Sequence, residues 1–156
     1  MCSSDLRPQV SLRVHATCVA LQAGRRWRGV LLRGPSGAGK SDLALRLIEA
    51  GARLVSDDQT ELVRQGKAVM ATAPTRISGL IEARGVGIVK LNRDQVVARV
   101  AVALLADLTS SEDIERLPEP ESESLLGVEL PRLVLAPFEA SAPAKLQLAL
   151  RRIAVA

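Results

Sequence analysis

The sequence predicts a single α/β domain with a central mixed β-sheet that is flanked by helices. The 156 residues, of which 47% are apolar, can bury one core but are too few for two ordinary domains. Short apolar runs bounded by turn residues alternate with segments of helical period, an order that favours a mixed sheet with helices. The valine-rich run at 96–105 is typical of a strand in the centre of such a sheet.

The first third of the chain predicts a hairpin, a buried strand and a helix. Residues 11–21 alternate and then become apolar, turn signals fill 24–28, and 29–32 form a second apolar run. This pattern indicates a hairpin that leads into a buried strand. Residues 41–50 carry apolar side chains at helical spacing, and Gly51 ends the expected helix as a C-terminal cap.

The middle of the chain is expected to be rich in strands. A short strand is predicted at 53–56, and a hairpin is centred on Gln65 and Gly66. An extended stretch at 67–74 follows. Residues 79–91 combine charges with glycines, and we expect them to form a glycine-punctuated loop with an apolar strand at its end.

The last third predicts a loop, one more strand and a closing helix. Residues 109–124 are acidic and contain proline, which is typical of a mobile loop. A last strand is expected at 133–135, and a helix at 143–153. Residues 1–8 join no periodic pattern, so we expect a disordered or non-native tail and a folded domain at 9–156.

Composition excludes several classes of protein. A formal charge of +4, a single Trp, a single Phe and no Tyr disfavour a nucleic-acid partner that stacks bases on aromatic rings. The two cysteines lie near one end, which indicates no disulfide framework, and no Cys/His cluster has metal-ligand spacing. No apolar run approaches the length of a membrane helix, and residues 1–8 lack the apolar core of a signal peptide, so we expect a cytoplasmic protein with no membrane association.

Residues 34–41 read GPSGAGKS and fit the phosphate-loop (P-loop) motif G-x-x-x-x-G-K-[ST] between a predicted strand and a predicted helix. The glycines let backbone N–H groups turn toward phosphate oxygens, and the start of the helix adds partial positive charge. Lys40 would reach the β- and γ-phosphates, and the Ser41 hydroxyl would bind Mg²⁺. The residues expected at the nucleotide are Gly34, Pro35, Ser36, Gly37, Ala38, Gly39, Lys40 and Ser41.

Two positions could supply the carboxylate that holds the metal or accepts a proton. Asp107 ends an apolar run as an ordinary Walker B aspartate does, whereas Asp57 and Asp58 follow the predicted strand after the P-loop helix. Adjacent carboxylates at a strand end can also be no more than a solvated turn. Spacing alone does not choose between these positions.

Several separated segments resemble the HPr kinase/phosphorylase family in the right order. These are His15, the P-loop, the Asp57–Asp58 pair and the segment IEARGVGIVK at 81–90. The last of these is similar to the family's signature segment, which a generic ATPase has no reason to carry. Further on, DIERL at 113–117 resembles a family segment that contains a catalytic arginine, and LGVELP at 126–131 resembles the stretch that follows it. The resemblance thus extends from about His15 to Pro131 and implies an HPr kinase / PEP carboxykinase-like P-loop fold.

The resemblance also implies roles for individual residues. His15, Lys40, Asp58 and Arg116 would be catalytic, with Asp58 as the proton acceptor. Ser41 and Glu82 would bind Mg²⁺, and Asp57 and Arg84 would support the site.

The implied activity is ATP-dependent phosphorylation of a serine on the phosphocarrier protein HPr. The same site would remove that phosphoryl group by phosphorolysis, with phosphate as acceptor and pyrophosphate as product. Family members have a further N-terminal domain, so we expect a short form that contains only the catalytic domain, assembled as a hexamer. The family's late proline-glycine-arginine-asparagine motif is reduced here to Pro143, Ala144 and Lys145.

Two other functions are compatible with a P-loop. A small-molecule kinase of this class would normally have a lid rich in arginine or lysine, but the candidate loop at 109–124 is acidic. A regulatory module that senses ATP without transferring phosphate would keep the P-loop and place Asp58 or Arg116 too far from the phosphates for transfer.

Overall fold

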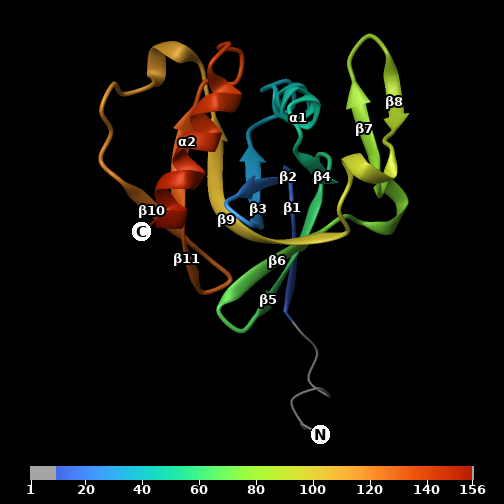
Figure 1. The fold of residues 1–156 in the computed structure, drawn as a ribbon, viewed down its shortest axis with the longest axis horizontal. Helices are drawn as coiled ribbons and strands as arrows, with labels where there is room; N and C mark the ends of the chain where they lie inside the picture. Colours follow the sequence, from blue (N-terminus) through green and yellow to red (C-terminus); the bar gives the residue numbers. More distant parts are fainter. Residues whose placement is uncertain (1–9, 156) are drawn as a thin grey trace, which may run out of the picture.

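The computed structural model describes residues 10–155, and the tail expected at residues 1–8 lies outside this range. Within these residues, nine strands form one curled mixed sheet, and a separate two-stranded hairpin stands beside it (Figure 1). The sheet strands are β1 (Ser11–Val14), β2 (Ala16–Ala23), β3 (Arg26–Arg33), β4 (Arg53–Ser56), β5 (Thr60–Gln65), β6 (Ala68–Thr72), β9 (Arg99–Leu108), β10 (Glu121–Leu125) and β11 (Val128–Leu135). The hairpin is β7 (Leu80–Ala83) and β8 (Gly87–Lys90), and the α-helices are α1 (Lys40–Glu49) and α2 (Ala142–Val155).

The order of the main sheet is β1-β5-β6-β9-β3-β2-β4, with β11 paired to β9 and β10 paired to β11. Strand β9 is the strand that makes the sheet mixed, because it pairs parallel with β3 and β11 but antiparallel with β6. The predicted α/β class with a central mixed sheet is therefore confirmed.

Two apolar clusters hold the sheet from its two faces. On one face, α1 and α2 pack through Leu43, Leu47 and Leu146 against the buried residues of β2, β3 and β9 that face the helices. On the other face, alternate residues of the same strands pack with β5 and β6. The period of two along each strand produces this division. Within residues 10–155, no helix is long and apolar enough to cross a membrane.

Several predicted elements are confirmed. The β2–β3 hairpin, helix α1, strand β4, the β5–β6 hairpin around Gln65 and Gly66, and helix α2 lie where the sequence predicts them, within a few residues. Each of these elements carries a local signal, such as an apolar period or a glycine turn. Gly51 has φ +107 after α1, which is the left-handed conformation expected of a C-terminal cap.

Other expectations are wrong in detail. The stretch at 79–91 ends in the expected strand, β8, but its first half is a second strand, β7, instead of a loop. The acidic stretch at 109–124 contains a 3₁₀ helix (Ser111–Asp113) and most of β10. The central strand occupies Arg99–Leu108, and the last strand is longer than expected at Val128–Leu135. Strands β8 and β10 are mostly exposed, so their apolar pattern is weak.

One edge of the sheet gathers the ends of several strands. Strands β3, β9 and β11 are parallel, and β2 is antiparallel to both β3 and β4. The chain therefore leaves β3 and β4 at the same edge and enters β2 there. This edge receives Gly34 after β3, Asp57 after β4, Pro137 after β11 and His15 before β2. Ligands of α/β sheets commonly bind outside the carboxyl ends of strands.

Candidate active site

The P-loop connects β3 to α1 in the conformation that its glycines permit. Gly37 and Gly39 have φ values of +85° and +99°, a region that other residues rarely adopt. The N–H of Ala38 donates to the carbonyl of Pro35 at 3.0 Å and closes the loop. Gly39 is the N-cap of α1 and offers no side-chain acceptor, so the first N–H groups of the helix are available to an anion.

Lys40 lies against the loop that precedes it. Its Nζ donates to the carbonyl oxygens of Gly34 at 2.7 Å and Pro35 at 3.1 Å, and its side chain is only 5% exposed. The same Nζ lies 4.0 Å from Oδ1 of Asp58. One cation therefore faces both the loop that would hold phosphates and the nearest candidate base.

Asp57 is the most tightly held carboxylate of the site. Its Oδ1 accepts hydrogen bonds from Ser41 at 2.6 Å and from Thr17 at 3.0 Å. Its Oδ2 accepts a hydrogen bond from the backbone N–H of Glu82 at 2.9 Å. The contact with Ser41 is the one that a metal-binding carboxylate makes to a P-loop serine. Asp57, which the sequence predicts to support the site, therefore lies directly against the P-loop serine.

Asp58 projects toward the pocket from a strained turn. It has φ +66°, and the N–H of Gln59 donates to the carbonyl of Asp57 at 2.7 Å, so Asp58 is the central residue of a γ-turn. Its own N–H donates to Oγ1 of Thr17 at 3.0 Å. Its Oδ1 lies 2.7 Å from Nε2 of His15, and the side chain is 57% exposed.

His15 sits in a bend between β1 and β2, so the stretch at 11–21 is two strands and not one continuous strand. The bend separates two pairings, because β1 pairs with β5 whereas β2 pairs with β3 and β4. His15 is thereby free to turn toward Asp58.

Thr17 is a site residue that the sequence reading missed. Its side chain is fully buried, and its hydroxyl donates to Asp57 while accepting from the N–H of Asp58. It fixes both members of the carboxylate pair. A hydroxyl residue in a mostly apolar strand, two positions after His15, is the sequence feature that could have indicated this role.

The β7–β8 hairpin forms the opposite wall of the site. Ile81 is buried in the helix-side cluster, and the N–H of Glu82 is held by Asp57, so β7 is fixed beside α1. The side chains of Glu82 and Arg84 are exposed and line a pocket of about 430 Å³. Residues of the P-loop, Asp57, Asp58 and Phe138 line the same pocket.

Asp107 does not share this pocket. Its carboxylate accepts hydrogen bonds from Arg33 and Arg132, each as short as 2.6 Å. Burial alone would raise the pKa of Asp107, but the hydrogen bonds and positive charges of the two arginines outweigh burial and hold the pKa below its usual value. Asp107 is thus a structural ion-pair partner, and Asp57 occupies the position next to Ser41 that a Walker B aspartate would need.

Arg116 lies apart from the other predicted residues. It is exposed, between the 3₁₀ helix at Ser111–Asp113 and β10, and it is not among the residues that line the pocket. Its catalytic role stays a prediction.

The residues that meet Asp57 suit a Mg²⁺ ion. A serine hydroxyl and carboxylate oxygens are the ligands that this hard cation prefers. No group of three or more His, Cys, Asp or Glu side chains within residues 10–155 could hold a metal alone. Ser41 and Asp57 would hold the ion, and its other ligands would come from water and nucleotide phosphates, as is common for Mg²⁺.

The fold and the site together define an α/β phosphate-loop domain with a carboxylate pair beside the loop. Comparison with known proteins shows the family to which this domain belongs. The family model described as the HPr serine kinase C-terminal domain matches residues 9–146, and the chain belongs to this family.

Relatives and a solved structure agree with this assignment. The HPr kinase/phosphorylase of Leptothrix cholodnii is 37% identical over 118 residues, which are 69% of this chain and 36% of the relative. That of Geobacillus thermodenitrificans is 36% identical over 116 residues, 69% of this chain and 38% of the relative. The chain thus spans just over a third of the length of these relatives. The structure of the HPr(Ser) kinase/phosphatase from Coxiella burnetii matches with a TM-score of 0.79 and 26% identity, over 92% of this chain and 97% of that chain.

Proposed function

We propose that the chain is an ATP-dependent serine kinase that acts on an HPr-type phosphocarrier protein and also dephosphorylates it by phosphorolysis. The observation that supports this best is the placement of Asp58. Its carboxylate lies 4.0 Å from the P-loop lysine and is oriented by His15, while its partner Asp57 holds the P-loop serine. A proton acceptor next to a phosphate site is what transfer to a hydroxyl requires.

The P-loop and α1 bind and orient the ATP phosphates. The N–H groups at the start of α1 point toward the site, and Lys40 is close enough to move from the loop carbonyls onto phosphate oxygens. Mg²⁺, when bound, neutralises charge on the β- and γ-phosphates. Ser41 and Asp57 would hold it, with Glu82 as a further ligand at the hairpin wall.

Asp58 takes the proton of the attacking serine hydroxyl. The serine oxygen forms a bond to the γ-phosphorus, the bond to the β-phosphate oxygen breaks, and ADP leaves. His15 keeps the carboxylate pointed into the pocket, and Lys40 stabilises the negative charge that spreads over the transferred group. Arg116 would add a second cation if its loop closes toward the pocket.

The reverse reaction uses the same groups. An oxygen of inorganic phosphate attacks the phosphorus of phosphoserine, and the bond to the serine oxygen breaks. Asp58 returns its proton to that oxygen, and pyrophosphate leaves. The carrier would be bound at the open side of the pocket, beside the β7–β8 hairpin. We further propose that the protein is cytoplasmic and that it assembles as a hexamer, as the family resemblance implies.

The test is to incubate the full chain with ATP, Mg²⁺ and an HPr-type carrier and to follow phosphoserine by intact mass. Formation of phosphoserine supports the kinase, and its loss with release of pyrophosphate after addition of excess phosphate supports the phosphorylase. The Lys40→Ala variant should show no ATP turnover. Binding of ATP by the unaltered chain without any transfer would contradict the proposal and favour a small-molecule kinase or an ATP-sensing module.

A further inference from the structure

Phe138 is the single phenylalanine of the chain, and 69% of its surface is exposed. It follows β11 at the edge of the sheet where the P-loop also lies, and it lines the same pocket. An exposed aromatic ring in a ligand pocket offers a flat apolar surface that water solvates poorly. The proposed chemistry of phosphate transfer gives this ring no role.

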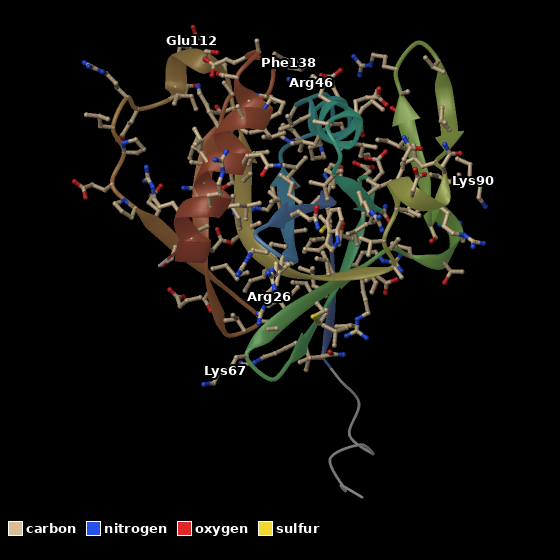
Figure 2. The ribbon with its side chains drawn as sticks, viewed as in Figure 1. Arg26, Arg46, Lys67, Lys90, Glu112 and Phe138 are labelled. Atoms are coloured by element: carbon tan, nitrogen blue, oxygen red, sulfur yellow. The ribbon has the colours of Figure 1, made fainter. Side chains whose placement is uncertain are left out.

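The backbone on both sides of Phe138 is fixed. Arg46 of α1 donates from Nη2 to the carbonyl of Pro137 and from Nη1 to the carbonyl of Glu139 at 3.4 Å. The N–H of Ala142 donates to the same carbonyl of Glu139 at 3.1 Å at the start of α2. Figure 2 shows Phe138 and Arg46 at the same end of the molecule. The exposed ring is therefore carried by a segment that is anchored to both helices.

The ring lies directly against the P-loop. A Cβ placed on Gly39 would be 2.8 Å from Cζ of Phe138 and 3.2 Å from Cγ of Pro137. Gly39 precedes Lys40 and Ser41, which face the carboxylate pair at 4.0 Å from Asp58 and 2.6 Å from Asp57. The pocket thus has a charged part at the carboxylates and an aromatic part at Phe138, and the P-loop contacts both.

We propose that Phe138 is the stacking platform for the base of the nucleotide whose phosphates lie on the P-loop. A nucleoside triphosphate has the same division as the pocket, with a charged chain at one end and a planar aromatic base at the other. The ring of Phe138 stacks on the base, and the glycine at position 39 lets the ring approach the loop closely. This inference rests on the proposed function, because it requires a nucleotide at the P-loop.

In proteins that bind single-stranded nucleic acid, stacking of one base on one aromatic ring changes the dissociation constant by about tenfold. Phe138→Ala should therefore weaken ATP binding by about tenfold and leave binding of inorganic tripolyphosphate within about twofold, since tripolyphosphate has no base. Phe138→Trp should keep the ATP affinity of the unaltered chain, and Phe138→Leu should resemble the alanine variant. Leu148→Ala, which removes an exposed apolar side chain of α2 outside the pocket, is the matched control.

Titration calorimetry measures the dissociation constants that test whether Phe138 stacks on the base. Thermal melts check that each variant is folded. Equal ATP affinity in the unaltered chain and both the alanine and leucine variants would overturn the inference and leave the proposed function standing. Equal weakening of ATP and tripolyphosphate would also overturn it, because the ring would then only shape the loop. Unchanged ATP affinity with slower transfer to the carrier would assign Phe138 to the protein substrate instead. Failure of the unaltered chain to bind either ligand would contradict the proposed function itself.

Discussion

Nε2 of His15 lies 2.7 Å from Oδ1 of Asp58, although 43 positions separate the two residues in the chain. The contact joins the bend before β2 to the turn after β4, and these two strands are neighbours in the sheet. The start of β2 and the end of β4 lie at the same edge of the sheet, so the two side chains meet next to the P-loop.

Asp58→Asn should stop phosphoryl transfer and leave ATP binding unchanged. The amide has nearly the shape of the carboxylate but cannot accept the proton, and loss of a general base slows transfer by a factor of about 10² to 10⁴. The measurement is kcat for phosphoserine formation together with the dissociation constant for ATP. Asp94→Asn, at an exposed carboxylate outside the pocket, is the control. Full transfer by the Asp58 variant would place the base elsewhere.

Thr17→Val should lower both stability and kcat. Valine keeps the shape, but the N–H of Asp58 loses its acceptor and the Asp57 carboxylate loses a buried donor. Loss of a buried hydrogen bond to a carboxylate costs about 1–3 kcal/mol in the free energy of unfolding. Urea denaturation and the transfer assay measure the two effects, and Thr17→Ser should restore both. A valine variant that is destabilised but has an unchanged kcat would show that Thr17 supports the fold without positioning the pair.

Arg116→Ala should slow transfer, because the variant lacks the cation that this loop would bring to the transferred phosphoryl group. Its stability should not change, because Arg116 is exposed and lies outside the pocket. If the loop closes during the reaction, the loss should appear in kcat and not in the dissociation constant for ATP. The neighbouring Glu115→Gln variant changes an exposed charge in the same loop and serves as the control. An Arg116 variant with normal kcat would remove this residue from the active site.

Asp107→Asn should reduce stability at neutral pH and flatten its decline in acid. Because the pKa of Asp107 is lower in the folded protein than in the unfolded chain, the carboxylate stabilises the fold at pH values above its unfolded pKa of about 3.9. That contribution is lost as the pH falls through this range to the folded pKa. The lost bonds to Arg33 and Arg132 correspond to about 1–3 kcal/mol at pH 7, less if solvent screens them.

Urea denaturation between pH 3 and pH 7 tests this expectation. Glu123 contributes in the same direction, because the Arg33 guanidinium that donates to it holds its pKa below the usual value. The Asp107→Asn variant should therefore still lose some stability in acid, but less than the unaltered chain. Parallel curves for the two proteins would show that Asp107 does not titrate differently in the folded state.

The fold class and the P-loop could be predicted because their signals are local. The strand, glycine loop and helix at 29–50 are contiguous, and the α1 cap and the β5–β6 turn depend on neighbouring residues. The β7–β8 and β10–β11 hairpins were missed. Gly85 and Gly87 have positive φ in the first hairpin, and glycines read more readily as a loop. The second hairpin includes Glu121 and Glu123, which pair with arginines from other strands.

The candidate site was predicted in part for the same reason. Lys40, Ser41 and Asp57 follow from motif and order along the chain, and the structure brings them together. Thr17 gained its role only through the antiparallel pairing of β2 with β4, which places it between the two aspartates. Phe138 entered the pocket because β11 runs parallel to β9, and no local pattern encodes that neighbourhood.

The positive φ of Asp58 has a consequence for how substitutions are selected at this position. Glycine tolerates φ +66° without steric cost, and a non-glycine residue there costs about 1–3 kcal/mol. A screen for thermal tolerance alone would thus enrich Asp58→Gly, and a screen for phosphoryl transfer would remove it. At this γ-turn, stability and phosphoryl transfer favour different residues, and the aspartate is the residue that transfer requires.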